Sequence, residues 1–459
     1  MGNIAFKTCL QIHYYRKSAF TLLGRWFLGI TGIFIFSASV AQQAEPAIPH
    51  DQEALYRFNL QRLFYASDKT FTDTLVRFDQ KLKAFSRHLE GAQQSDWLSK
   101  QTQALSRLEF EFRQMDLYLF LQYAINTNNT KAAEREDSLY EEMVKYRNRF
   151  KDKVRSMPEA AFKKQILHPA LQPYQYYLHN IRRLGSHEPS AEQQQVAKNF
   201  AYLKDGRFYT EHLNKAPFDN IIIGADTLDL FQDMGKWQHH PDSSIRKEGE
   251  RKMAAGYSSM KQSVGYGYIQ LINGLNAFAS FRKYDNLVSE TCDKLNITKQ
   301  LLDTIFSTIE ASAKSLYVVP QHPAASTLIF PIQKTTRILL ETFSVLGSTY
   351  SAEAKALLEP SNGRMDIAGG EARLGMQGVA SVYPIHTSVF YARKYEGYFI
   401  DVMVLAHEAG HAIQASMMAR HGVSMLNSSG PGYFTESFGK FNELLVTHYL
   451  NKHAGNTVE

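Results

Sequence analysis

Cysteine is nearly absent from this 459-residue chain, which contains only Cys9 and Cys292. Two thiols cannot build a disulfide framework or a cysteine-based zinc cluster, so any bound metal must be held by histidine and carboxylate side chains. Internal repeats and low-complexity segments are missing as well. The content of 44% hydrophobic and 12% aromatic residues is that of a folded chain with a large core.

The first forty positions contain no acidic residue. They carry a basic region, an apolar run over residues 26–36, and the small residues Ser39, Val40 and Ala41 where a signal peptidase would cut. We therefore predict a signal peptide over residues 1–41, cleavage after Ala41, and export to the periplasm or the medium. The apolar run is shorter than the roughly 20 residues of a membrane-spanning helix, although an uncleaved N-terminal anchor stays an alternative.

The mature chain has no marked charge of either sign. Cleavage after Ala41 removes four of the 51 basic residues and leaves 47 against 45 acidic ones. A nucleic-acid partner would require a concentrated basic face, so we expect none. We also expect no stable membrane insertion once the signal peptide is removed.

Apolar residues at helical spacing dominate the rest of the chain and predict a mainly α fold. Thr298 is a predicted helix N-cap, with Leu302, Ile305 and Ile309 on one face of the helix that follows. Glycines are frequent between residues 361 and 398, where we expect a small sheet that includes Thr387–Tyr391. Two long amphipathic helices are predicted from Leu105, Leu108, Phe112, Met115 and Leu119, and from Met253, Tyr257, Met260, Val264, Tyr268 and Leu271.

The clearest chemical signal is the sequence His-Glu-Ala-Gly-His at residues 407–411. Residues four apart share one face of a helix, so His407 and His411 can bind the same zinc ion. Glu408 is offset by one position, which places its carboxylate beside the open side of the metal as a general base. Gly410 is unfavourable inside a helix and indicates close packing there.

A third ligand is available further along the chain. The segment Ser428–Gly432 predicts a turn, after which a second helix would carry Glu436 back to the two histidines. Glu443 lies seven residues later, near the same helix face, and either orients a ligand histidine or is a solvated glutamate. Asp401 is interpreted as a helix-start cap rather than a second orienting carboxylate.

These motifs resemble the thimet oligopeptidase and oligoendopeptidase F family of zinc metallopeptidases, which are gluzincins. The resemblance is carried by residues 395–402 leading into the 407–411 motif, by Phe434-Thr435-Glu436 with Glu443, and by residues 281–286 followed by Asn296-Ile297-Thr298. It covers about residues 240–450.

The resemblance implies a two-lobed, mainly helical oligopeptidase fold with a small sheet near the active-site helix. It implies a 42–240 N-terminal helical domain and a 241–459 metallopeptidase catalytic domain. One Zn²⁺ per chain would be bound by His407, His411 and Glu436, with Glu408 as catalytic base and short peptides as substrates. Thr387–Tyr391 is the candidate edge strand for the substrate backbone, against a purely structural strand.

The sequence departs from the family after the third ligand, because family members continue for more than a hundred residues beyond it. We therefore expect a catalytic domain that is truncated at its C-terminus. The segment expected to complete the oxyanion pocket would be missing, and Tyr433 and His448 are weak substitutes. Two alternatives follow: a zinc carboxypeptidase of a related gluzincin family, and a truncated peptide- or zinc-binding protein without turnover.

Overall fold

The computed structural model describes residues 46–90, 95–189, 191–200, 203, 218–224, 226–230, 233–316, 328–385, 388–428 and 430–453. The predicted signal peptide lies outside these residues, and export after Ala41 stays a prediction. In the part of the chain that is described, no helix is both long and apolar enough to cross a membrane.

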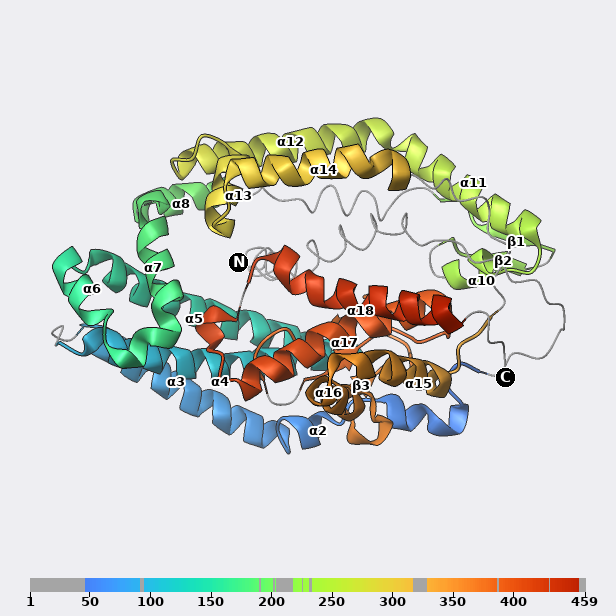
Figure 1. Ribbon diagram of the computed structural model, residues 1–459, viewed down its shortest axis with the longest axis horizontal. Helices are drawn as coiled ribbons and strands as arrows, with labels where there is room; N and C mark the ends of the chain where they lie inside the picture. Colours follow the sequence, from blue (N-terminus) through green and yellow to red (C-terminus); the bar gives the residue numbers. More distant parts are fainter. Residues whose placement is uncertain are drawn as a thin grey trace. The chain divides into compact units, whose positions relative to one another are not determined.

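The chain is mainly helical, as predicted (Figure 1). The α-helices are α2 (Leu60–Leu63), α3 (Asp68–Glu90), α4 (Trp97–Ile125), α5 (Thr130–Ser156), α6 (Glu159–Gln165), α7 (Gln175–Arg183), α8 (Ala191–Asn199), α10 (Met234–Gln238), α11 (Ser243–Ser259), α12 (Lys261–Phe281), α13 (Leu287–Leu295), α14 (Lys299–Leu316), α15 (Ile332–Phe343), α16 (Ser348–Leu358), α17 (Phe399–Arg420) and α18 (Gly432–His453). Short 3₁₀ helices are η2 (His50–Tyr56), η3 (Pro169–Tyr174), η4 (Leu184–His187), η6 (Ser344–Leu346), η7 (Pro360–Asn362) and η8 (Met425–Asn427).

Contacts divide the chain into two units. The split unit combines residues 42–183 with residues 328–459, and the inserted unit contains residues 184–327. The predicted domain boundary after residue 240 therefore falls inside the inserted unit. Sequence reasoning missed this arrangement because a discontinuous unit leaves no change in composition at its crossings.

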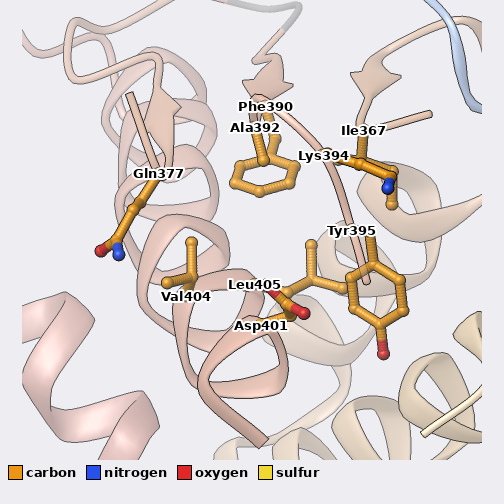
Figure 2. Close-up of a pocket in the computed structure, with 9 residues that line it drawn as sticks. All are labelled: Ile367, Gln377, Phe390, Ala392, Lys394, Tyr395, Asp401, Val404 and Leu405. Atoms are coloured by element: carbon orange, nitrogen blue, oxygen red, sulfur yellow. The ribbon is translucent and has the colours of Figure 1, made fainter. Parts of the chain in front are cut away.

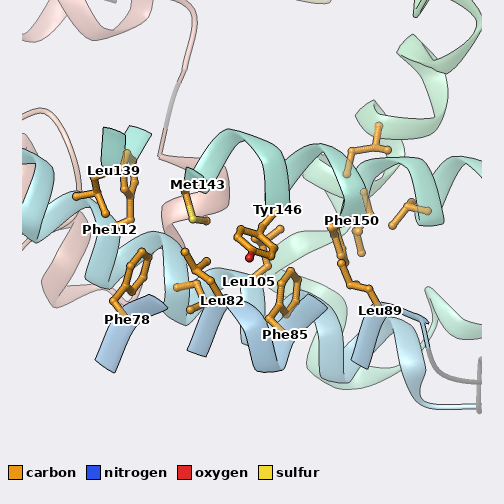
Figure 3. Close-up of a cluster of buried hydrophobic side chains, with 14 of the residues drawn as sticks. Phe78, Leu82, Phe85, Leu89, Leu105, Phe112, Leu139, Met143, Tyr146 and Phe150 are labelled. Atoms are coloured by element: carbon orange, nitrogen blue, oxygen red, sulfur yellow. The ribbon is translucent and has the colours of Figure 1, made fainter. Parts of the chain in front are cut away.

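The first core of the split unit lies between α3, α4 and α5. Figure 3 shows Phe78 and Phe85 of α3, Phe112 of α4 and Phe150 of α5 pointing into the space between these helices. Leu105, Leu108, Phe112, Met115 and Leu119 are all buried, which confirms the helix predicted from their spacing. Asn129 caps α5 by accepting a hydrogen bond from the Ala132 amide at 3.3 Å.

The second core of the split unit is formed by α15, α16, α17 and the start of the described chain. Ile48 and Tyr56 are buried there among residues from Phe330 to Val446. Backbone hydrogen bonds fix this N-terminal segment, since the Ile332 amide donates to Ala47 at 2.8 Å and the Ile367 amide to Tyr56 at 3.1 Å. Residues separated by some 300 positions thus share one core.

Two small sheets complete the described structure. In the inserted unit, β1 (Ile221–Ile223) pairs antiparallel with β2 (Asp226–Leu228). In the split unit, β3 (Met365–Asp366), β4 (Val379–Ala380) and β5 (Phe390–Tyr391) form a sheet in the order β3-β5-β4. The small sheet expected among the glycines of residues 361–398 is therefore confirmed.

The inserted unit corrects one helix prediction. The pattern from Met253 to Leu271 suggested a single long helix, but α11 ends at Ser259 and α12 begins at Lys261, with Met260 between them. Apolar spacing continues across a break when both helices bury residues on the same side, so it cannot locate the break. Thr298 caps α14 as predicted, because its hydroxyl accepts from the Leu301 amide at 3.1 Å.

Candidate metal centre

His407 and His411 lie on one face of α17, one helical turn apart. Their Nε2 atoms are 3.1 Å from each other. The His411 side chain is buried, and that of His407 is 14% exposed. The spacing of the motif and the regular helix thus place both imidazoles toward one point, as the sequence predicted.

Glu436 reaches the same point from α18. Its Oε2 atom lies 3.2 Å from His407 Nε2 and 3.7 Å from His411 Nε2. The turn predicted at Ser428–Gly432 follows η8, and its last residue begins α18. Among the described residues, His407, His411 and Glu436 are the group of three side chains that could hold a metal ion, with ligand atoms all within 4.8 Å of one another.

The three donor atoms fit a zinc ion in geometry and in chemistry. A tetrahedral zinc with bonds of about 2.0–2.1 Å needs ligand atoms about 3.3 Å apart, close to the three distances found here. Two histidines and one glutamate are a ligand set typical of catalytic zinc, which keeps its fourth position open. The two facing imidazole nitrogens and the carboxylate oxygen are all acceptors when unprotonated, and one cation between them would satisfy all three.

Glu443 holds His407 from the other side. Its Oε1 atom is 2.6 Å from His407 Nδ1, which resolves the two roles considered for this residue in favour of orienting a histidine. A proton on Nδ1 that is donated to Glu443 leaves the Nε2 lone pair facing His411 and Glu436. Lys440 in turn donates to both carboxylate oxygens of Glu443, at 2.7 and 3.0 Å.

The electrostatics of this cluster favour a positive charge at its centre. Burial lowers the pKa of His407, but hydrogen bonds to Glu436 and Glu443 outweigh it and raise the pKa to about 9. Burial raises the pKa of Glu436, yet the two histidines lower it to about 2. The pKa of Glu443 is also lowered, because hydrogen bonds from His407 and Lys440 outweigh its burial.

Glu408 lies beside the donor atoms without belonging to the group. Its side chain is buried, and burial raises the pKa of its carboxyl group above the ordinary value. The Oε2 atom has no hydrogen-bond partner in the described structure. A buried carboxylate oxygen without a partner is costly, which is common where a group is kept free for chemistry.

Two glycines bring α17 and α18 into backbone contact. A Cβ atom on Gly410 would lie 2.6 Å from the Phe438 carbonyl oxygen, and one on Gly439 would lie 2.6 Å from the His407 ring. Asn442 also links the helices, because its Nδ2 donates to the Ala406 carbonyl at 3.1 Å. Gly410 therefore has the packing reason that its place inside a helix requires.

The sheet above α17 corrects the proposed edge strand. The centre of the sheet is β5, paired with β3 on one side and with β4 on the other, so Phe390 and Tyr391 offer no free edge. The free edge nearest Glu408 belongs to β4. Sequence reasoning chose the β-favouring residues, and these are most strongly favoured in the buried central strand. Thr387 lies outside the described residues.

A small cavity separates this sheet from the first turns of α17. Its volume of about 10 Å³ gives room for one water molecule. Figure 2 shows Phe390 and Ala392 on one side and Val404 and Leu405 of α17 on the other, with Asp401 at its edge. This cavity is too small for a peptide.

Asp401 caps α17, as predicted. Its Oδ2 atom accepts hydrogen bonds from the backbone amides of Tyr398 at 3.0 Å and Glu396 at 3.1 Å. Burial raises its pKa to about 6 despite these bonds. Tyr433 is 59% exposed and His448 is exposed as well.

Three residues that contact the site were missed in the sequence: Gly439, Lys440 and Gly378, whose added Cβ atom would meet Glu408. Gly378 and Gly439 act through close approach, which leaves no residue pattern. Lys440 had a detectable signal, since it lies three residues before Glu443 on the same helix.

Comparison with solved structures finds several with the same fold. A protein from Chlamydophila abortus assigned as a peptidase has a TM-score of 0.64 and 17% identity, over 90% of this chain and 73% of that one. A protein from Bacillus anthracis assigned as oligoendopeptidase F has a TM-score of 0.54 and 13% identity, over 82% and 71%. PZ peptidase A, solved with an inhibitor, has a TM-score of 0.56 and 15% identity, over 83% and 68%.

No protein-family model and no curated protein sequence matches the chain. The structural likeness confirms an oligoendopeptidase-like fold, which is the fold that the sequence resemblance implied. At 13–17% identity the likeness concerns the fold.

Proposed function

We propose that this protein is a zinc-dependent peptidase that cleaves short peptides internally. The observation that carries the proposal is the convergence of His407 Nε2, His411 Nε2 and Glu436 Oε2, with buried Glu408 beside them. This combination of three zinc ligands and an adjacent carboxylate is suited to hydrolysis by an activated water. One zinc ion per chain is expected.

Each residue of the site has its own role. His407, His411 and Glu436 would hold the metal, and Glu443 fixes the ring of His407. The bound zinc supplies Lewis acidity toward the scissile carbonyl and the attacking water. The Glu408 carboxylate takes a proton from that water and gives it to the leaving amine. Burial raises the pKa of Glu408, which makes it a stronger base than an exposed glutamate.

The free edge of β4 is the proposed place for the substrate backbone. In the antiparallel pairing with β5, the Ser381 amide donates to Val389, so the backbone groups of Ala380 point away from β5. A peptide in extended conformation can pair with such an edge through its own amides and carbonyls. Recognition through the backbone would tolerate varied side chains.

The test uses an internally quenched peptide blocked at both termini, with the wild type, Glu408→Gln and Glu310→Gln. Wild type should contain one zinc per chain and cut the peptide. Glu408→Gln should keep the zinc and lose about 10²–10⁴-fold in kcat, because the general base is removed. Glu310 is an exposed glutamate of α14, so Glu310→Gln should behave as wild type.

Other outcomes identify the alternatives. Cleavage only of peptides with a free C-terminus would indicate a zinc carboxypeptidase. A zinc-loaded wild type without cleavage would indicate a binding protein. Absence of zinc would reject the site itself.

A further inference from the structure

Gly378 lies immediately before β4, directly against the side chain of Glu408. A Cβ atom on Gly378 would be 2.8 Å from Glu408 Cγ, 2.8 Å from Val404 Cγ1 and 3.0 Å from Glu408 Oε1. The first two distances are shorter than real Cβ contacts. The strand and the base therefore approach one another as closely as a glycine allows.

Glycine is needed at position 378 because a side chain would have no room, and not because of the backbone conformation. Gly378 does not have the positive φ that would demand glycine, in contrast to Gly369 and Gly370 in the same loop. Gly375, three residues earlier, has no atom within 4 Å of its added Cβ. Of these glycines, Gly378 is the one whose missing side chain leaves room for Glu408.

The segment that leads into β4 lies closer to one oxygen of this carboxylate. The Oε1 atom of Glu408 faces this segment, 3.0 Å from the place of a Cβ atom on Gly378. The other oxygen, Oε2, is buried and has no partner among the described residues. One oxygen thus lies against the segment that leads into β4, and the other has no partner.

We propose that Gly378 is a positioning residue for the general base. Gly378 lets the Glu408 carboxylate lie close to β4 with Oε1 against the strand, so that Oε2 is the oxygen left for the reacting water. This inference rests on the proposed function, because it assigns the orientation of the same carboxylate. It adds that the strand proposed to bind the peptide also sets the position of the base.

The first test compares Gly378→Ala with the matched control Gly375→Ala. Gly378→Ala should lower kcat by about 10²-fold, because a displacement of about 1 Å at the reacting group has an effect of this size. KM and zinc content should change little, since neither the β4 edge nor the three ligands are altered. Gly375→Ala should match the wild type.

A loss confined to KM or to zinc content would overturn the proposal, because it would locate the damage in the strand or the metal site. Wild-type kcat in Gly378→Ala would overturn it as well. In the Glu408→Gln background, Gly378→Ala should add no further loss of kcat, since both changes act through one group. Additive losses would contradict the inference.

A second readout needs no enzymatic activity. In metal-free protein, Gly378→Ala should lower the Tm, and the loss should be smaller when Glu408→Ala removes the side chain that the new methyl group meets. Equal Tm losses in both backgrounds would overturn the inference. Coupled Tm values in a protein that cleaves no peptide would reject only the proposed function. The double variant also remains informative if Gly378→Ala alone fails to fold.

Discussion

The α3–α5 bundle and the α17–α18 pair both consist of long helices, but they are held together by opposite kinds of surface. In the bundle, large side chains such as Phe78, Phe112 and Phe150 fill the space between helix axes (Figure 3). In the α17–α18 pair, Gly410 and Gly439 let the two backbones touch. The bundle is therefore sensitive to lost volume, and the pair is sensitive to added volume.

The largest expected effect comes from removing volume in the bundle. Phe112 is fully buried in α4, and Phe112→Ala should lower the free energy of unfolding by about 3–5 kcal/mol because it leaves a cavity. Urea unfolding followed by helix content measures this loss. Phe306 of α14 is 57% exposed, so Phe306→Ala should change stability by less than about 0.5 kcal/mol. Equal losses would mean that the bundle core is not tightly packed.

A smaller effect concerns the partly buried carboxyl group of Asp401 at the start of α17. The pKa of Asp401 is about 6 in the folded chain and 3.8 in its ordinary state, so the folded chain holds this proton more tightly. Its contribution to stability is fully present below about pH 4 and is lost as the pH rises through 6, by about 2–3 kcal/mol. Asp401→Asn should remove that loss when unfolding is measured from pH 4 to pH 7.

Asp242 provides the matched control, because it also caps a helix. It accepts from the Ser244 amide at 2.8 Å, and backbone and side-chain hydrogen bonds from Ser244 lower its pKa below the ordinary 3.8. Its stabilising effect is present above pH 4 and is lost only at lower pH. Asp242→Asn should therefore leave the pH dependence between 4 and 7 unchanged. If the free energy of unfolding varied with pH equally in the wild type and in Asp401→Asn, the pH dependence could not be assigned to Asp401.

The smallest expected effect on stability comes from adding volume between α17 and α18. Gly439→Ala places a methyl group against the His407 ring and should cost about 1–3 kcal/mol. It should also weaken zinc binding, measured by competition with a chelating dye, because the ring is displaced. Gly265 of α12 has open space around it, so Gly265→Ala should instead raise stability by about 0.4–1 kcal/mol. A gain of stability in both variants would show that the backbones are not in contact.

The sequence predicted those parts of the site that depend on one helix. The spacing of His407, Glu408 and His411 fixes their relative directions once α17 forms, and α17 needs only its apolar residues and the Asp401 cap. Glu436 was predicted from the turn at Ser428–Gly432 and the helix that follows it, and the family resemblance agreed with this choice. Glu443 stayed undecided because its role depends on the distance between α17 and α18, which Gly410 and Gly439 set.

Burial was predicted less well than secondary structure. The face of α14 that carries Ile305 and Ile309 was read correctly as a helix face, yet these residues are 45% and 53% exposed. The helical spacing of apolar residues shows that they share one face of the helix. It does not show what covers that face. The free edge of β4 was missed for a related reason. Gly378 matters because it lacks a side chain and Ala380 because its backbone groups face the edge, and neither property is visible in composition.

The position of Ile48 and Tyr56 in the second core has a consequence for synthesis of the chain on the ribosome. Most of the residues around them lie between Phe330 and Val446, so this N-terminal segment emerges long before its partners. The α3–α5 core can close as soon as residue 181 or so is made, since its buried residues run from Phe71 to Ile181. The earliest part of the described chain is therefore among the last to be packed. Its apolar residues stay exposed to solvent while the inserted unit is synthesised.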